Sequence, residues 1–441
     1  MRLQLRSSLV KPAKKVIGKQ RLTVLVNVSF PAPNQRPDKL ILSGLFHLMA
    51  AMSDVCLPAD SVLPDFDGGG IHGLANSLAN WLAAPGQAPA FLLDRDDPPQ
   101  RSIVLIVIDG LGDGFLQRHG QGSHLLRYRR RRLTSVFPST TASAVTTLMT
   151  GLSPAEHGLN GWYIHDQRFG GVILPLPLQL RAGGPLRAPF LTWRLFPYRC
   201  MFAQSQLPTS FVSPTEIAFS PFSRRHARGA LIRGYDGLDG FRQQICAAVA
   251  AQGARGFVHA YYARFDAMSH QFGPDAPEVI EEFWRIDRCL GAVFDELSGL
   301  GTEVWLTADH GFIDASESRH VHLEDHPELA TMLNGPLFGE RRAAFCKARE
   351  GAEDELLAYV SSRLAGKAVA AASPSLLEAG LFGPGKQHKR LPERLGSHAI
   401  LMEPGWTLSD CLPGEKEHAM KGVHGGLSAD EMWVPLVQLR P

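Results

Sequence analysis

Acidic residues and histidines follow three apolar segments of this sequence at the points where those segments end. Ile103–Ile108 runs into Asp109, Phe257–Tyr262 runs toward Asp266, and Val304–Leu306 runs toward Asp309-His310. In an open parallel sheet the carboxyl ends of the strands share one edge, where ligands and catalytic groups lie. Carboxylates and imidazoles gathered at that edge indicate a metal site.

Later histidines complete two sets of three metal ligands. The first set is Asp109, Asp309 and His310, and the second is Asp266, His270 and His424. Catalytic zinc has three protein ligands and one open position, and mixed nitrogen and oxygen donors suit Zn²⁺ or Mn²⁺ better than Mg²⁺ or Ca²⁺. The spacing of Asp266 and His270 fits one helical turn or a tight loop. We therefore expect two divalent ions, which at a separation of roughly 4 Å can clamp a transferring phosphoryl group.

A threonine-rich turn, Ser139-Thr140-Thr141, precedes a predicted helix at residues 142–150. Thr141 is the candidate nucleophile of this turn. A free hydroxyl is a poor nucleophile at neutral pH, but metal coordination lowers its pKa, and the start of a helix adds positive potential and amide donors. A phosphate group would bind at this turn.

Each of these features has a simpler explanation when it is taken alone. An Asp after a strand is more often a turn or cap residue, the tripeptide Asp309-His310-Gly311 can occur by chance, and threonine-rich turns usually cap helices. Their ordered appearance along one chain, with the acidic residues at strand ends, favours the functional explanation.

The elements that must position these residues alternate between strand and helix. The run Ile103–Ile108 is apolar throughout, as in a strand covered on both faces. A second strand is expected at Leu133–Phe137, and the following helix is closed by Gly151. Further helices are expected near residues 71–82, 238–249 and 279–297. This order predicts an α/β fold with a doubly wound, mostly parallel sheet.

The pattern changes between Phe312 and Ala419 to short helices and loops. We expect four parts: a basic, poorly ordered extension at 1–55, a catalytic α/β core at 56–312, an inserted smaller α+β segment at 313–418, and a return to the core at 419–441. Inserted segments at the ligand edge of a sheet commonly shape substrate access. We therefore describe residues 313–418 as a cap-like segment, whose role the sequence leaves open.

Six short motifs resemble one family of phosphoryl-transfer enzymes. They are Ile106-Val107-Ile108-Asp109-Gly110, Val136-Phe137-Pro138-Ser139-Thr140-Thr141, Thr150-Gly151-Leu152-Ser153-Pro154-Ala155-Glu156-His157-Gly158, Asp266-Ala267-Met268-Ser269-His270, Ala308-Asp309-His310-Gly311 and Val423-His424-Gly425. As a set they resemble the type I phosphodiesterase/nucleotide pyrophosphatase branch of the alkaline phosphatase superfamily, over roughly residues 60–313 and 419–441. The resemblance implies an alkaline phosphatase-like fold and a di-zinc enzyme.

The same resemblance implies a role for each matched residue. Thr141 would be the nucleophile that is phosphorylated. Asp109, Asp309 and His310 would hold the ion that activates Thr141, and the second set would hold the other ion. Ala144 departs from the pattern, because eukaryotic-type members carry asparagine there, so the sequence leaves the preference for nucleotides open.

Other functions of the superfamily are alternatives to a phosphodiesterase. Sulfatases need a Cys-x-Pro-x-Arg-like segment, and this chain has none. A phosphomonoesterase is the second choice. A non-catalytic metal-binding relative ranks lower, because all six ligands and the threonine hydroxyl are present.

Composition sets limits on partners and location. A formal net charge of +2 on 441 residues gives no general case for nucleic-acid or membrane binding. The longest early apolar run, Leu40–Met52, is too short to span a bilayer. Six widely spaced cysteines without a CxxC motif favour free thiols, so a cytoplasmic location is expected, with export as the alternative. The expected partner is a small phosphate ester or nucleotide, and the oligomeric state is not specified.

Several residues near the motifs have simpler expected roles. The arginine-rich run at residues 127–132 is expected to be a solvated loop face. Trp162 and Tyr163 are expected to fill the core, with stacking on a nucleobase as the alternative. Five further histidines are expected to be structural or surface residues: His157, His165, His320, His322 and His326.

Overall fold

The structure is a computed structural model that describes residues 55–441 apart from 87–88, 93–101, 254 and 416–418. All but the last residue of the expected N-terminal extension (1–55) lies outside the described residues. Of the helices in the described part of the chain, none combines the length and the apolar character that a membrane span requires.

A seven-stranded sheet forms the centre of the catalytic part, in the order β2-β18-β9-β1-β8-β6-β7. Its strands are β1 (Ile103–Ile108), β2 (Arg129–Thr134), β6 (Thr209–Pro214), β7 (Leu231–Tyr235), β8 (Phe257–Tyr262), β9 (Glu303–Thr307) and β18 (Trp433–Leu439). Strands β9, β1, β8, β6 and β7 pair in parallel, whereas β18 is antiparallel to both of its neighbours. The expected mostly parallel sheet is confirmed.

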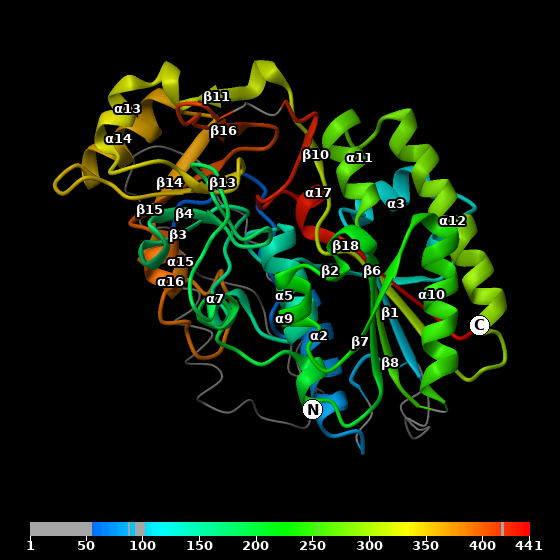
Figure 1. Ribbon diagram of the computed structural model, residues 1–441. Helices are drawn as coiled ribbons and strands as arrows, with labels where there is room; N and C mark the ends of the chain where they lie inside the picture. Colours follow the sequence, from blue (N-terminus) through cyan, green and yellow to red (C-terminus); the bar gives the residue numbers. More distant parts are fainter. Residues whose placement is uncertain (1–54, 87–88, 93–101, 254, 416–418) are drawn as a thin grey trace, which may run out of the picture. The chain divides into compact units, whose positions relative to one another are not determined.

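Helices cover both faces of this sheet (Figure 1). Helices α10 (Gly237–Gln252) and α12 (Pro277–Leu297) pack together on one side, and α2 (Ile71–Ala83) and α5 (Thr141–Thr150) pack together on the other. Every residue of β1 is therefore buried, which explains why its sequence is apolar throughout rather than alternating. The doubly wound arrangement and the bounds expected for β1 are confirmed.

Shorter helices connect or flank these elements. They are α3 (Asp113–His119), α4 (His124–Arg127), α6 (Pro154–His157), α7 (Leu191–Leu195), α8 (Thr215–Ala218), α9 (Pro221–His226), α11 (Arg264–Phe272) and α17 (Ala429–Met432). The two 3₁₀ turns η1 (Gln167–Phe169) and η2 (Met201–Gln204) lie among them, with a small antiparallel sheet of β3 (Ile164–Asp166), β4 (Gly171–Leu174) and β5 (Gln179–Leu180).

The arginine-rich run is part of an edge strand, so its expected place in a loop is wrong. Strand β2 begins at Arg129 and ends at Thr134, short of the expected Leu133–Phe137, because its backbone pairs with β18. The guanidinium of Arg132 lies 3.9 Å from the centroid of the Trp433 ring. The methylene groups and the guanidinium plane of an arginine can pack against an aromatic ring while the charge stays hydrated. This polar strand is therefore stable at the edge of the sheet.

Residues 313–418 contain a second sheet of four antiparallel strands, in the order β12-β13-β15-β14. Its strands are β12 (Phe338–Gly339), β13 (Ala343–Cys346), β14 (Ala368–Ala372) and β15 (His398–Met402), and its helices are α13 (Pro327–Met332), α14 (Glu353–Arg363), α15 (Ser373–Glu378) and α16 (Leu391–Leu395). These helices and strands bury their own apolar side chains, including Leu356, Val360 and Ile400. The segment therefore has a core of its own beside the larger one.

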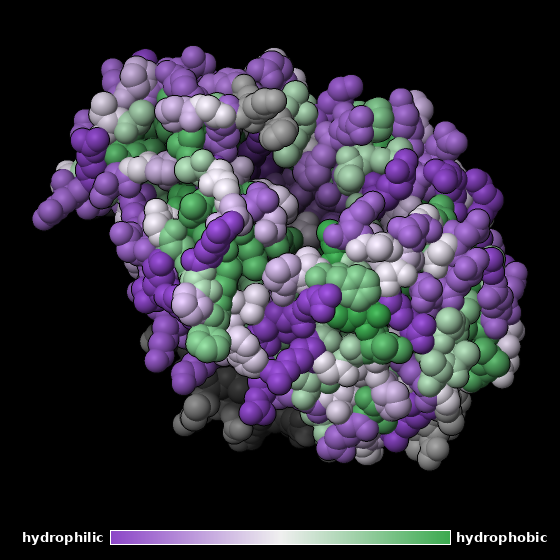
Figure 2. All heavy atoms as spheres, in the orientation of Figure 1, coloured by the Kyte–Doolittle hydropathy of each residue, from purple (hydrophilic) through white to green (hydrophobic). Residues whose placement is uncertain are grey.

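Two short ladders connect this segment to the chain around it. Strand β10 (Ile313–Asp314) pairs with β17 (Gly422–Val423), and β11 (His320–His322) pairs in parallel with β16 (Thr407–Ser409). The 3₁₀ turns η3 (Glu317–Arg319) and η4 (Leu323–Asp325) flank β11. Figure 2 shows the surface hollowed between this segment and the part that carries α11.

Candidate metal centre

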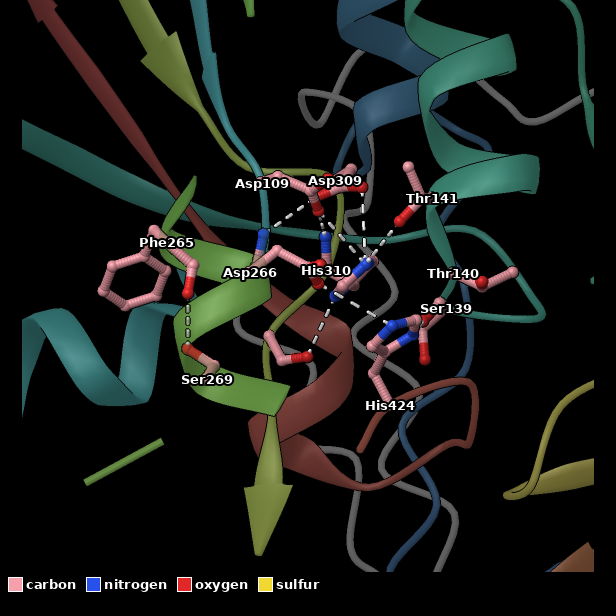
Figure 3. A network of polar contacts seen from close by, with 12 residues as sticks. Asp109, Ser139, Thr140, Thr141, Phe265, Asp266, Ser269, Asp309, His310 and His424 are labelled. Carbon is pink, nitrogen blue, oxygen red and sulfur yellow. Dashed lines mark hydrogen bonds and ion pairs between the residues drawn. The ribbon is translucent and has the colours of Figure 1, made fainter. Parts of the chain in front are cut away.

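Three carboxylates meet at the edge of the sheet where β9, β1 and β8 end (Figure 3). Asp109 directly follows β1, Asp309 comes two residues after β9, and Asp266 lies in the first turn of α11, the helix that follows β8. These strands are adjacent and parallel, so their carboxyl ends lie side by side. The sheet thus brings together acidic residues that are up to 200 positions apart in the sequence.

Three histidines face these carboxylates. His270 lies one helical turn after Asp266 in α11, so the spacing of this pair reflects a helix rather than a loop. His310 follows Asp309, and His424 follows β17. The rings of His310 and His424 stack with centroids 3.7 Å apart. All six side chains predicted as ligands therefore come together in one place.

One oxygen of each carboxylate is buried without a hydrogen-bond partner among the described residues: Asp109 Oδ1, Asp266 Oδ1 and Asp309 Oδ2. His310 Nε2 lies 3.4 Å from both Asp109 Oδ1 and Asp309 Oδ2. Asp266 Oδ1 lies 3.5 Å from His270 Nε2 and 3.8 Å from His424 Nε2.

These separations fit ligands of a common ion better than hydrogen bonds. A tetrahedral ion with bonds of about 2.1 Å places its ligand atoms about 3.4 Å apart. An unpaired buried carboxylate oxygen is costly, and a cation would satisfy it. The donor geometry of the described residues therefore fits divalent metal.

Each histidine ring is held in the orientation that a metal ligand needs. The Nδ1 atoms of His270, His310 and His424 lie 2.8, 3.1 and 3.1 Å from the carbonyl oxygens of Gly422, Gly311 and Ser139 respectively. An Nδ1–H that donates to a carbonyl leaves Nε2 with its lone pair, and all three Nε2 atoms face the carboxylates. The backbone thus selects one tautomer at all three positions.

Burial and the neighbouring charges shift the pKa values of several side chains in this centre. Burial, followed by the negative charges of Asp309 and Asp266, raises the pKa of Asp109 well above its ordinary value. Burial and the charge of Asp309 also raise the pKa of Asp266. Burial, with the neighbouring His310 and His270, lowers the pKa of His424 well below its ordinary value. Without a cation, the protein disfavours the ionised forms of Asp109 and Asp266, although it keeps His424 neutral and able to ligate.

The six residues divide into two overlapping donor groups. Asp109, Asp309 and His310 offer ligand atoms within 4.8 Å of one another, and so do Asp266, His310 and His424. His310 therefore lies between the two groups, whereas the sequence placed it in the first set alone. His270 stays next to Asp266 and is available to the second ion.

Thr141 lies beside the first donor group at the start of α5. Its Oγ1 is 3.2 Å from His310 Nε2, and its side chain is partly exposed while the neighbouring residues Thr140 and Ala142 are buried. The unpaired amides of the first helical turn add positive potential at this point. A hydroxyl, a helix N-terminus and a cluster of metal donors therefore meet where a phosphate could bind.

One expectation near Thr141 needs correction. Ala144 is buried in the hydrophobic core, and the preference for nucleotides that its residue type leaves open stays open. Trp162, expected in the core, is 39% exposed. The backbone N–H of Trp162 donates to Glu340 Oε1 at 2.6 Å, and the hydroxyl of Thr140 donates to the same oxygen at 2.6 Å. One carboxyl group thus connects the exposed tryptophan to the residue before Thr141.

The loop that carries His424 is held by a buried ion pair. Glu431 Oε1 accepts the Gly426 N–H at 2.7 Å, and the fully buried guanidinium of Arg342 lies 3.0 Å from Glu431 Oε2. On the other side, the hydroxyl of Ser139 donates to the Gly426 carbonyl at 2.7 Å. The nucleophile turn, the His424 loop and the inserted segment are thereby tied together.

Sequence reasoning missed two residues that support the centre. Phe312 packs its ring against all three ligand histidines, with centroids 4.9, 5.6 and 5.2 Å from those of His270, His310 and His424. The hydroxyl of Tyr261 donates to Asp109 Oδ2. In the β1–β8 ladder, Tyr261 pairs with Val107, which is two residues before Asp109. A tyrosine near the end of the neighbouring strand was therefore the signal in the sequence that could have identified it.

We predict that Tyr261→Phe weakens metal binding by roughly 10- to 100-fold, the range typical for loss of a group that orients a metal ligand. The variant loses the hydroxyl that holds Asp109 while keeping the ring in the core. Tyr262→Phe is a matched control, because its hydroxyl donates to Glu282, away from the centre. Competition with a metal indicator would measure both affinities, and equal affinities in the two variants would contradict the prediction.

Most of the remaining histidines have structural partners. His157 is buried beneath α5, with Nε2 3.1 Å from the Thr147 hydroxyl. His165 lies 3.1 Å from the Lys347 ammonium, and His326 lies 3.0 Å from the Tyr359 hydroxyl. The structural role expected for these three is confirmed.

The chain is similar in sequence to known phosphodiesterases and pyrophosphatases. The family model for type I phosphodiesterase/nucleotide pyrophosphatase matches residues 103–427. An uncharacterised pyrophosphatase/phosphodiesterase of Schizosaccharomyces pombe is 23% identical over 353 residues, which cover 74% of this chain and 68% of that protein.

Solved structures show the same fold. Murine ectonucleotide pyrophosphatase/phosphodiesterase 5, as an inactive threonine-to-alanine variant in complex with AMP, superposes with a TM-score of 0.56 at 16% identity, over 76% of this chain and 87% of that one. The human protein gives a TM-score of 0.53 at 17% identity over the same shares. The fold is thus the alkaline phosphatase-like α/β fold of these proteins. The match to the family model covers well over half of this chain. The chain therefore belongs to the type I phosphodiesterase/nucleotide pyrophosphatase family, whose members hydrolyse phosphate esters.

Proposed function

We propose that this protein is a di-zinc phosphodiesterase or nucleotide pyrophosphatase that works through a phosphothreonine intermediate. The observation that carries the proposal is the set of three buried, unpaired carboxylate oxygens 3.4–3.8 Å from imidazole nitrogens, with the Thr141 hydroxyl beside them. Family membership adds phosphate-ester hydrolysis as the reaction class.

Asp109, Asp309 and His310 would hold one ion, and Asp266, His270 and His424 the other. Zn²⁺ suits these donors best, with Mn²⁺ as the alternative. When bound, the ions would lower the pKa of the Thr141 hydroxyl and offset charge on the phosphoryl oxygens.

The chain's own residues then perform two displacements. Thr141 Oγ1 gives up its proton and attacks phosphorus in line, forming an O–P bond as the bond to the leaving alcohol or phosphate breaks. The leaving oxygen takes up a proton and departs. Water then attacks the phosphothreonine from the same side as the departed group, which releases phosphate or a phosphate monoester and restores the hydroxyl. The amides at the start of α5 are placed to stabilise the phosphoryl oxygens in both steps.

The proposed substrate is a small nucleotide ester or pyrophosphate. The murine structural neighbour is described in complex with AMP. In this chain the backbone N–H of Trp162 and the hydroxyl of Thr140 donate to the same oxygen of Glu340, so the partly exposed Trp162 belongs to a loop held next to the nucleophile turn. Aromatic side chains of this kind can stack on a nucleobase.

A comparison of two chromogenic esters tests the proposal. We expect the zinc-loaded protein to hydrolyse bis(p-nitrophenyl) phosphate faster than p-nitrophenyl phosphate, and to release AMP from a nucleotide pyrophosphate. A strong preference for the monoester would instead make the protein a phosphomonoesterase. Bound zinc with no turnover of any ester would make it a non-catalytic metal-binding relative.

A further inference from the structure

A third group of metal-binding side chains lies in the inserted segment, outside the centre described above. Glu317, His320 and His322 each offer a ligand atom within 4.8 Å of the other two. Glu317 begins η3, and the two histidines are the ends of β11. None of the three belongs to either donor group of the metal centre. Figure 1 places β11 next to β16 in the inserted segment, apart from the strand ends that carry the centre.

The local structure puts both imidazoles on the same side of a strand. His320 and His322 are two residues apart in β11, and side chains at that spacing point to one face. Their rings are nearly parallel, with centroids 4.2 Å apart and an interplanar angle of 5°. His322 Nε2 lies 3.2 Å from Glu317 Oε1. The ligand atoms of one carboxylate and two imidazoles thus lie close to one another.

The strand beneath these histidines is firmly held. Val321, between them, is buried, and so is Leu408 of the paired strand β16. The Oγ of Ser409 lies 2.7 Å from His320 Nε2, which orients that ring. Glu317, by contrast, has an 86% exposed side chain. Two donors are therefore held by the strand, and the third lies exposed to solvent beside His322.

The chemistry of the donors and the local charge favour a transition metal. Two imidazoles and one carboxylate match Zn²⁺, and Ni²⁺ or Cu²⁺ among its neighbours, rather than Mg²⁺ or Ca²⁺. From residue 314 to residue 325 the chain carries Asp314, Glu317, Glu324 and Asp325 against one arginine, Arg319, so the local charge favours cations.

We propose that Glu317, His320 and His322 form a separate structural Zn²⁺ site, which pins η3 to the β11–β16 ladder. A bound ion would take the place of the direct contact between His322 Nε2 and Glu317 Oε1. It would order the stretch that leads from Asp309-His310 and β10 into the inserted segment. The proposal makes His320 and His322 ligands, whereas the sequence favoured structural or surface residues, and it does not depend on the proposed catalytic function.

Zinc content after equilibrium dialysis of the tag-free protein tests the site. We expect His322→Ala and His320→Ala each to bind one Zn²⁺ fewer per chain than the unchanged protein, with hydrolysis unaltered. His326→Ala is the matched control, because His326 lies in the same segment but bonds Tyr359, and it should lose no zinc. The predicted quantity is a difference of one ion, whatever number the metal centre holds. Equal zinc content in His322→Ala and the unchanged protein would overturn the proposal.

Amide hydrogen exchange tests the structural role separately. Addition of Zn²⁺ should slow exchange in residues 315–322 of the unchanged protein and leave that stretch unaffected in His322→Ala. The same protection in both proteins would show that the ion acts elsewhere. Absence of protection in both proteins would contradict the proposal that the ion holds η3 in place.

Discussion

Thr141→Ala is expected to reduce ester hydrolysis by roughly 1,000-fold or more, the scale on which enzymes lose activity when their nucleophile is removed. The residue is the first of α5, and the only hydrogen bond of its side chain among the described residues is the contact between Oγ1 and His310 Nε2. The N-cap residue Thr140 makes no side-chain cap bond that the change could disturb. Metal content and thermal stability should therefore stay close to those of the unchanged protein.

Two further variants show whether the hydroxyl itself is responsible. Thr141→Ser keeps a hydroxyl at the same place and should retain measurable turnover. Thr146→Ala removes another threonine hydroxyl from α5, one that donates to the Ala142 carbonyl inside the helix, and should retain hydrolysis. A rapid-quench experiment should trap phosphate on the unchanged protein and none on Thr141→Ala. Near-normal activity in Thr141→Ala would refute the nucleophile assignment.

The fold was predictable where local pattern and tertiary burial agree. The strand Ile103–Ile108 is apolar because both of its faces are covered, and the expected helix at 279–297 buries the stripe that its spacing indicated, including Phe283 and Leu290. The helix after the threonine turn ends at Gly151 in the left-handed conformation, as its sequence indicated. Such elements carry their structural signal within a single window of sequence.

Strand β2 shows where this reasoning fails. Its arginines have no apolar alternation, so nothing local marks them as a strand. The strand forms because β18, some 300 residues later, offers a pairing edge and Trp433 offers a ring for Arg132. Pairing between distant segments can override local propensity, and a single sequence does not record it.

The residues of the metal centre also differ in how far the sequence predicted them. The ligands were predictable because carboxylates at strand ends and an Asp-x-x-x-His spacing have a direct geometric meaning. Tyr261 and the ion pair of Arg342 with Glu431 were not, because each acts on a ligand from another strand or from the inserted segment. Phe312 follows His310 closely in the sequence, but its contacts with His270 and His424 arise only when distant parts of the chain pack together. Residues that orient ligands follow from register and packing, which only the structure supplies.

Removal of metal with a strong chelator is expected to abolish hydrolysis and lower the thermal midpoint of unfolding. Asp109, Asp266 and Asp309 each keep a buried oxygen without a hydrogen-bond partner among the described residues, so loss of cations leaves their charges uncompensated. Zn²⁺ should restore both activity and stability. Mn²⁺ should restore them in part, and Mg²⁺ should fail, because imidazole ligands suit the first two ions better. Full activity in the chelated protein would contradict a metal-dependent reaction.

The cost of removing metal should grow as pH rises. In the metal-free protein the pKa values of Asp109 and Asp266 are raised above their ordinary value of 3.8, so the stability that their protonated forms contribute is present at low pH and is lost as pH increases through the raised values. Bound cations favour the ionised carboxylates and the neutral imidazoles, and their affinity therefore increases over the same range. The difference in thermal midpoint between zinc-loaded and chelated protein should widen from pH 5 to pH 8. Because both samples share every other titrating group, a difference that stayed constant or narrowed would mean that these carboxylates do not hold the ions.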